Sequence, residues 1–141
     1  MEERFKNMGD HLTMIVDSTP CPIQRPKDPF IQSKFYNGKF KKHIIKYEMA
    51  ISWNDYKIVW KSNAYLGFVH DITISRNSEL LDSMLRGEVV FADKGYVGNS
   101  RFWTPFKGIL QNSSQYEWSV WVSKRRIVVE HLFSKNQMVC L

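Results

Sequence analysis

The most regular pattern in the chain is an alternation of apolar and polar side chains over residues 45–53. A period of two predicts a β-strand with one buried face and one exposed face. Lys46 and Glu48 fall on the polar face of this strand. A turn at residues 54–55 would then lead into a partner strand over residues 56–61, so the pattern predicts a hairpin. The apolar face would carry Ile45, Tyr47, Met49, Ile51 and Trp53.

Two shorter apolar runs predict further strands, at residues 12–16 and 89–92. A short additional strand is expected near residues 104–106. Between the first run and the hairpin we expect an extended, irregular passage, because proline fixes its own φ and removes a donor from the sheet ladder. The prolines of this passage are Pro20, Pro22, Pro26 and Pro29.

Residues 71–85 place apolar side chains at helical spacing, which predicts a helix that Gly87 ends. Asp71 is expected to cap the N-terminus of this helix, since a short acidic side chain can accept from the first free backbone N–H groups. Gly95 and Gly98 follow the next strand and are expected to provide backbone angles that other residues avoid.

A second helix is predicted over residues 116–133, where apolar side chains form a stripe along one face. The tryptophans on the predicted apolar faces are expected in the core. The predicted order is three strands, a helix, a strand, a short strand and a final helix, which indicates an α/β fold with a mixed sheet. The stripe consists of Trp118, Trp121, Val122, Val129, Leu132 and Phe133.

Three acidic residues stand at informative places in these predicted elements. Asp17 and Asp93 each end an apolar strand, and Glu130 lies in the second helix. An aspartate at the carboxyl end of a strand can point into the crevice where open α/β sheets bind ligands. Two carboxylates on neighbouring strands, about 5 Å apart, repel each other unless a cation lies between them. We therefore hypothesise carboxylates that converge on Mg²⁺ or Mn²⁺, as phosphodiester chemistry requires.

Each of these acids also has an ordinary explanation. Asp17 precedes Ser-Thr-Pro and Asp93 precedes Lys-Gly, and aspartate is common in such turn sequences. Glu130 lies one helical turn after Arg126, so a simple ion pair on the helix surface would account for both. Spacing alone leaves the two explanations open.

Composition favours a single domain that binds a polyanion. The 141 residues are 43% hydrophobic and carry a net charge of +6, with a pI of about 9.4. Seven basic residues lie between Arg25 and Lys46 against one acid, although a solvated loop and strand edge would explain them equally well. The two cysteines fit no zinc-ligand spacing. The chain contains no apolar run long enough to cross a membrane and does not begin like a signal peptide, so neither membrane association nor secretion is expected.

Five short blocks carry more information than the spacing of the acids. They are VDSTPCPI at 16–23, YNGKFKKH at 36–43, GFVHD at 67–71, FADKGYVG at 91–98 and RIVVEHLF at 126–133. Together and in this order they resemble the DDE superfamily endonucleases of PIF/Harbinger-type transposases, their domesticated relatives and the similar insertion-sequence-5-type enzymes. The resemblance covers residues 12–135, about the whole of the predicted fold.

This resemblance implies an RNase H-like fold in which the first and fourth predicted strands lie side by side and parallel. It also implies metal-dependent DNA cleavage and joining, with Asp17, Asp93 and Glu130 as a catalytic and metal-binding triad for two Mg²⁺ or Mn²⁺ ions. DNA is the partner it implies, and a separate DNA-binding protein is a further candidate partner. Lys94 and Arg126 would either contact phosphate or balance the nearby acids. The DNA-binding residues are then Lys39, Lys41, Lys42, Lys94 and Arg126.

The chain differs from the usual pattern of that family at both ends and in one block. It begins close to Asp17 and ends at Leu141, which leads us to expect a truncated catalytic core, without an N-terminal DNA-binding region or a C-terminal continuation. The first block reads Asp-Ser-Thr, where Asp-Gly-Thr is more usual. A catalytically inert, domesticated or decayed module that binds DNA or protein is the alternative. The resemblance implies the nucleus as its location in a eukaryote and the cytoplasm otherwise.

Overall fold

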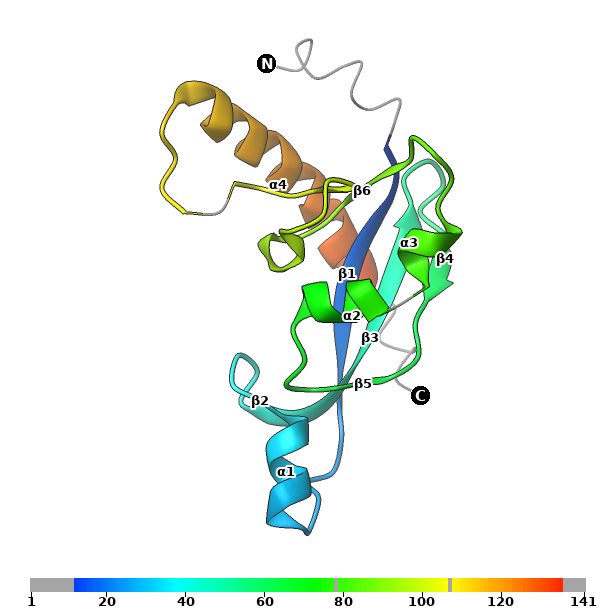
Figure 1. Cartoon of the computed structure of the whole chain (residues 1–141), viewed down its shortest axis with the longest axis vertical. Helices are drawn as coiled ribbons and strands as arrows, with labels where there is room; N and C mark the ends of the chain where they lie inside the picture. Colours follow the sequence, from blue (N-terminus) through cyan, green and yellow to red (C-terminus); the bar gives the residue numbers. More distant parts are fainter. Residues whose placement is uncertain (1–11, 78, 107, 136–141) are drawn as a thin grey trace.

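A mixed β-sheet forms the centre of the molecule (Figure 1). The computed structural model describes residues 12–77, 79–106 and 108–135. Within these residues the sheet has the order β2-β3-β1-β6-β7, and β4 and β5 also pair with β3. The strands are β1 (Leu12–Pro22), β2 (Tyr36–Asn37), β3 (Lys42–Ser52), β4 (Ile58–Lys61), β5 (Tyr65–Leu66), β6 (Val89–Phe91) and β7 (Phe102–Trp103).

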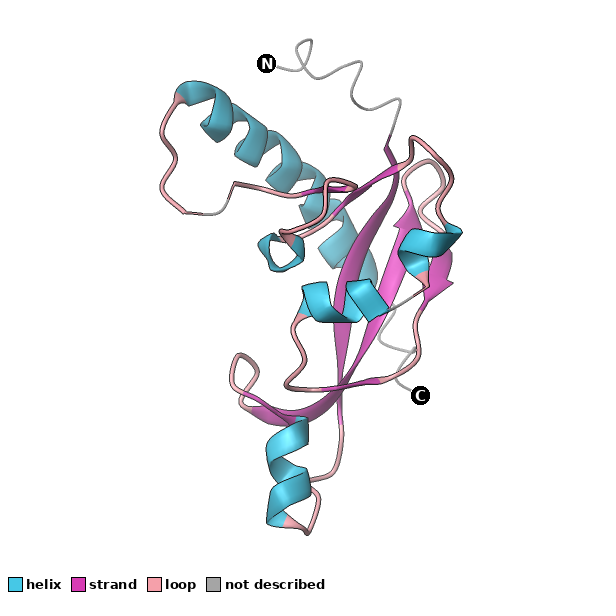
Figure 2. Ribbon diagram, in the orientation of Figure 1, coloured by secondary structure: helices cyan, strands magenta, loops and turns pink. Residues whose placement is uncertain are grey.

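Helices cover both faces of this sheet (Figure 2). In Figure 1, α2 and α3 cross in front of the central strands, and the long α4 runs behind them. None of the described helices is both long and apolar enough to cross a membrane. The helices are α1 (Pro29–Phe35), α2 (Asp71–Asn77), α3 (Leu80–Ser83), the 3₁₀ helix η2 (Lys94–Tyr96) and α4 (Ser113–Lys135).

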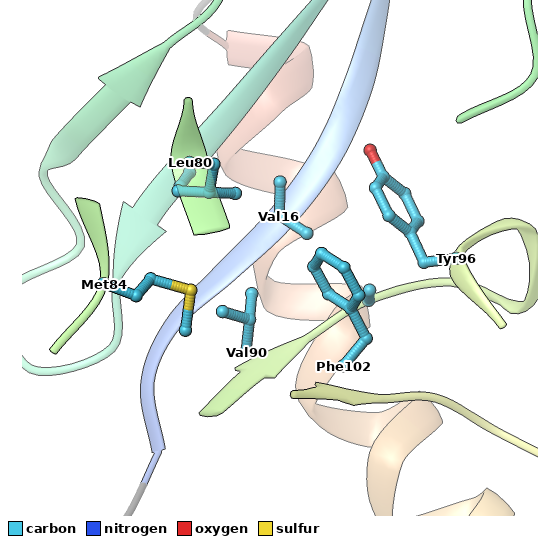
Figure 3. Close-up of a cluster of buried hydrophobic side chains, with 8 residues drawn as sticks. Val16, Leu80, Met84, Val90, Tyr96 and Phe102 are labelled. Atoms are coloured by element: carbon cyan, nitrogen blue, oxygen red, sulfur yellow. The ribbon is translucent and has the colours of Figure 1, made fainter. Parts of the chain in front are cut away.

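The alternation of side chains along β1, β3 and β6 divides the core into two clusters. On one face, Ile15, Ile51 and Phe91 pack with Trp121 and Val122 of α4. On the opposite face, side chains of β1 and β6 pack with side chains from α3, η2 and the edge strand β7, as Figure 3 shows. The labelled members of that second cluster are Val16, Leu80, Met84, Val90, Tyr96 and Phe102.

The predicted α/β class and mixed sheet are confirmed, and the arrangement agrees with an RNase H-like core. β1 pairs with β6 in parallel, as the family resemblance implied for the first and fourth predicted strands. The predicted second helix is α4, in which Trp121 and Val122 are buried and Trp118 and Leu132 pack against the same cluster. The side chains of Val129 and Phe133 lie outside the described part of the chain.

The predicted hairpin is confirmed, but the expected half-exposed strand is wrong. β3 and β4 pair antiparallel, and β4 begins at Ile58 because a longer turn precedes it. Lys46 and Glu48, expected on an exposed face, are both buried. The reason is that other elements, including α2, pack over the face that the alternation had assigned to solvent.

The irregular passage expected after residue 16 is confirmed only for residues 23–28, which lie between β1 and α1, and is wrong for the residues before and after them. β1 continues through Pro20 and Pro22, paired with β3. The N–H of Ile23 donates to the carbonyl of His43 (3.0 Å), so the two prolines lie at alternate positions whose missing N–H groups would point away from β3. β6 ends before this point, and β1 is therefore an edge strand on that side, where proline is tolerated.

A short helix follows this strand. Asp28 caps α1 by accepting from the N–H groups of Phe30 (2.7 Å) and Ile31 (3.1 Å). Pro29 stands in the first turn, where the absence of an N–H costs nothing.

Two further boundaries differ from the predictions. The helix expected over residues 71–85 divides into α2 and α3. The short strand expected near 104–106 is β7, which ends at Trp103.

Candidate active site

The parallel register of β1 and β6 brings the two aspartates together. Ile15 pairs with Phe91, and Asp17 and Asp93 each follow two positions later. Because side chains alternate along a strand, both aspartates lie on the face that packs against α4. The apolar run suggested that Asp17 ends its strand, but Asp17 lies inside β1. It lies instead where the neighbouring strand β6 ends, which opens the same crevice.

Helix α4 brings the third acid to this crevice. A cavity of about 420 Å³, here named the acidic cavity, is lined by Asp17, Asp93 and Glu130 together with Arg126 and Lys39. Three residues that are remote in the sequence and were predicted to converge therefore surround one cavity. Their catalytic and metal-binding roles remain predictions.

Arg126 forms ion pairs with two of the acids. Its Nη1 lies 3.1 Å from Oδ1 of Asp93, and its Nη2 lies 3.0 Å from Oε1 of Glu130. The second contact is the helical ion pair that offered an ordinary explanation for Glu130. The first contact joins α4 to the end of β6, so Arg126 also neutralises charge inside the cavity.

Asp17 is the most electrostatically strained of the acids. Burial raises the pKa of its carboxyl group from 3.8 to about 6. Arg126 and a hydrogen bond from the backbone N–H of Ser18 (2.8 Å) oppose this rise, whereas the charges of Asp71 and Asp93 add to it. A buried carboxylate with a raised pKa lacks sufficient positive charge nearby, and a bound cation would supply it.

The structure adds a polar network that the sequence did not indicate. Oδ1 of Asp71 accepts from Oγ of Ser18 (2.7 Å) and from Nζ of Lys46 (3.0 Å), and all three residues line the acidic cavity. Nζ of Lys46 also donates to the carbonyl of Val69 (2.9 Å). Since Ser18 donates its N–H to Asp17, the network holds the strand segment that carries this acid. No local pattern could have revealed it, because its members come from three separate elements.

Asp71 therefore does not have the role predicted for it. It is the first residue of α2, and its carboxylate binds Ser18 and Lys46. The carbonyl of His70 accepts the N–H groups of Thr73 (3.0 Å) and Ile74 (3.1 Å). His70 thus orders the start of the helix.

Gly95 and Gly98 serve different purposes. Gly98 has a φ of +130°, which agrees with the expectation of an unusual backbone angle. Gly95 is absent from the residues with positive φ, so the same expectation is wrong for it. A Cβ atom at Gly95 would lie 3.0 Å from Oδ2 of Asp71, so glycine is needed there to admit the Asp71 carboxylate.

Gly95→Ala is expected to lower the free energy of unfolding by about 1 kcal/mol, because the added methyl overpacks a carboxylate that Ser18 and Lys46 already fix. Gly38→Ala is the matched control, since its Cβ would meet nothing within 4 Å. Urea denaturation of both variants measures the difference. Equal stabilities would show that the close approach of Gly95 to Asp71 has no energetic consequence.

The predicted DNA-binding residues divide into two groups. Lys39 and Arg126 line the acidic cavity. Lys41 is exposed on the turn between β2 and β3, close to Lys39 in the sequence, and Lys42 is exposed as the first residue of β3. Lys94 is exposed on η2, directly after Asp93. These positions give cations inside the cavity and around it.

The acidic cavity offers carboxylate oxygens, which are the ligands that Mg²⁺ and Mn²⁺ prefer. The described residues nevertheless contain no group of three or more His, Cys, Asp or Glu side chains arranged to hold a metal ion. Arg126 already pairs with one oxygen each of Asp93 and Glu130, so a cation would either share these carboxylates with the guanidinium or displace it. The donor chemistry fits a divalent ion, and the raised pKa of Asp17 shows where its charge is needed.

An α/β sheet with carboxylates gathered where parallel strands end, beside a helix that adds a glutamate, agrees with the RNase H-like core that the sequence blocks implied. Residues 16–138 match the DDE superfamily endonuclease family, and the chain belongs to that family. The resemblance proposed from the five sequence blocks is thereby confirmed at the level of the superfamily.

A curated relative gives a more specific comparison. The chain is 31% identical over 138 residues to a protein of Microchaete diplosiphon described as a probable transposase for insertion sequence element IS702. This alignment covers 93% of the chain and 48% of the relative, so the chain spans about half the length of that protein. No solved structure matches the chain.

Proposed function

We propose that this chain is the catalytic core of a transposase-type endonuclease that cleaves DNA phosphodiester bonds with divalent metal ions. The observation that carries the proposal is the position of Asp17, Asp93 and Glu130 around one cavity, although they come from β1, β6 and α4. Family membership supports the reaction class, and the basic residues around the cavity support a polyanionic substrate.

In the proposed mechanism, Asp17, Asp93 and Glu130 would hold Mg²⁺ or Mn²⁺. Such ions can activate water or a 3′-hydroxyl and stabilise the departing oxygen of an in-line displacement. The network of Ser18, Lys46 and Asp71 fixes the segment that carries Asp17. Arg126, once released from Asp93 or Glu130, is free to pair with a phosphate oxygen at the mouth of the cavity.

The test is nicking of supercoiled plasmid by the full chain with Mg²⁺ or Mn²⁺, with Asp93→Ala as the inactive control. Conversion to the open-circular form by the wild type alone supports the proposal. A chain that binds the plasmid without nicking it would contradict the proposal and favour a second function, an inert module that binds DNA. The ion pairs of Arg126 with Asp93 and Glu130 favour that second function, because they balance the acids without metal.

The turn between β2 and β3 is proposed to contact DNA phosphates. Replacing Lys39, Lys41 and Lys42 together with glutamine is expected to reduce the dependence of log K on log[salt] by about 2 to 3, since each phosphate contact contributes about 0.9. The affinity should fall about tenfold or more at low salt. Fluorescence anisotropy with duplex DNA at several salt concentrations measures both quantities.

Lys57 and Lys61 provide the control for this prediction. Both are exposed; Lys57 lies on the turn between β3 and β4, Lys61 is the last residue of β4, and neither lines the acidic cavity. Replacing them with glutamine should change the salt dependence much less. Equal effects of the two sets would indicate attraction by net charge and no defined contact at the β2–β3 turn.

A further inference from the structure

A second cavity adjoins the acidic cavity. It has a volume of about 370 Å³ and is lined in part by Tyr36 and Phe68. The two cavities share Asn37, Lys39, Lys46 and Asp71 in their walls, so they lie side by side, and together they are named the aromatic depression. A volume in this range accommodates a small organic group such as a nucleobase.

Exposed aromatic side chains line this depression. Phe40 lines the acidic cavity with 40% of its surface exposed, and Phe68 lines the second cavity with 55% exposed. Tyr36, also in the second cavity, is exposed as well. Nζ of Lys39 lies 5.5 Å from the centre of the Phe40 ring. Exposed rings beside cations are the combination with which proteins stack unpaired bases and neutralise the adjoining backbone.

The turn that carries Lys39 and Phe40 is held firmly in place. Oδ1 of Asn37 accepts from the backbone N–H groups of Lys39 (3.0 Å) and Phe40 (3.3 Å). Nδ2 of the same side chain donates to the carbonyl of Gly67 (2.7 Å), which fastens the turn to the segment before α2. A binding residue on a fixed turn loses little conformational entropy when it contacts its ligand.

We propose that this aromatic depression binds an unpaired nucleobase of the DNA strand next to the cleaved phosphate. The inference rests on the proposed function, since it extends the same cavity and names the form of its DNA. Bases in a duplex are already stacked on their neighbours, whereas an unpaired base has a free face for Phe40 or Phe68. The substrate class is therefore DNA with single-stranded nucleotides beside the cleavage point.

The experiment compares two DNA ligands, a blunt duplex and the same duplex with an overhang of about five nucleotides, a length within one single-strand binding site. Anisotropy in Ca²⁺ measures binding, and the full chain is used throughout. The wild type should bind the overhang about tenfold more tightly than the duplex, and Phe40→Ala should lose most of that preference, because stacking contributes about 1–3 kcal/mol per base. Phe40→Trp should retain the preference.

A matched control is available in α1. Phe30 is 70% exposed, and Nζ of Lys34 lies 4.5 Å from its ring centre, but Phe30 lines neither cavity. Phe30→Ala should therefore leave the preference intact. A fluorescent base analogue such as 2-aminopurine in the overhang adds a direct readout, because stacking quenches it. Quenching is expected with the wild type and Phe40→Trp and not with Phe40→Ala.

The proposal is overturned if the wild type binds both ligands equally, if Phe40→Ala keeps the full preference, or if Phe30→Ala loses it to the same extent. These outcomes are independent of the plasmid assay. A chain that nicks plasmid without preferring the overhang retains the proposed function and loses this inference. A chain that prefers the overhang through Phe40 without nicking retains the binding site and loses the nuclease.

Discussion

Asp17→Asn is expected to reduce Mg²⁺-dependent nicking by at least about 10³-fold, which corresponds to about 4 kcal/mol of lost transition-state stabilisation. Asparagine keeps the size of the side chain and can still accept the hydrogen bond from Ser18, so the substitution removes charge with little change in packing. The rate of conversion of supercoiled to open-circular plasmid, measured with protein in excess, gives the effect on the chemical step.

Asp55→Asn is the matched control for this loss. Asp55 is an exposed acid on the turn between β3 and β4 that does not line the acidic cavity, and its replacement should leave the nicking rate unchanged. Asp93→Asn and Glu130→Gln should each repeat the loss seen for Asp17, because the three acids are proposed to act together. Wild-type nicking by Asp17→Asn would remove Asp17 from the mechanism.

The same substitution is expected to stabilise the metal-free protein. The pKa of Asp17 is 3.8 in its ordinary setting and about 6 in the folded chain, so ionisation above pH 6 costs the folded state as much as about 3 kcal/mol. Asparagine carries no charge and avoids this cost. At pH 7.5 in EDTA, Asp17→Asn should therefore have the higher free energy of unfolding in urea denaturation.

The pH dependence has a definite sign. A raised pKa in the folded state means that the folded protein holds its proton more tightly, so the wild type gains stability as pH falls from about 6 towards 3.8. The advantage of Asp17→Asn should shrink over this range and be lost near pH 4. Asp82→Asn, at an exposed acid on α3, should show little difference at either pH.

Bound metal ions should favour the stability of the wild type over that of Asp17→Asn. A divalent ion that binds only the folded protein stabilises it by RT ln(1 + [L]/Kd), where [L] is the concentration of the free ion. Mg²⁺ or Mn²⁺ should therefore stabilise the wild type and have a smaller effect on Asp17→Asn. A variant that is less stable than the wild type in EDTA at pH 7.5 would show that burial of Asp17 carries no electrostatic cost.

Local patterns in the sequence reveal features that lie within a single helix, strand or hairpin. The period of two over residues 45–53 predicted β3 and its hairpin, and helical spacing predicted α4, because each pattern reflects the geometry of one element. The parallel pairing of β1 and β6 followed from the family resemblance, whereas the candidate acids were already indicated by their places in the predicted elements. The prolines after Asp17 predicted an irregular passage, but an edge position allows Pro20 and Pro22 within β1.

The sequence by itself determined the main elements, the family and the three candidate acids, since these depend on residue type and short-range order. Only the tertiary structure decided that Lys46 and Glu48 are buried and that Asp71 joins Ser18 in the cavity wall. It also decided that Arg126 bridges two of the acids and that Phe40 lies at the proposed catalytic site. The physical reason is that burial and contact depend on which element packs over a given face, and residues remote in the chain fix that choice.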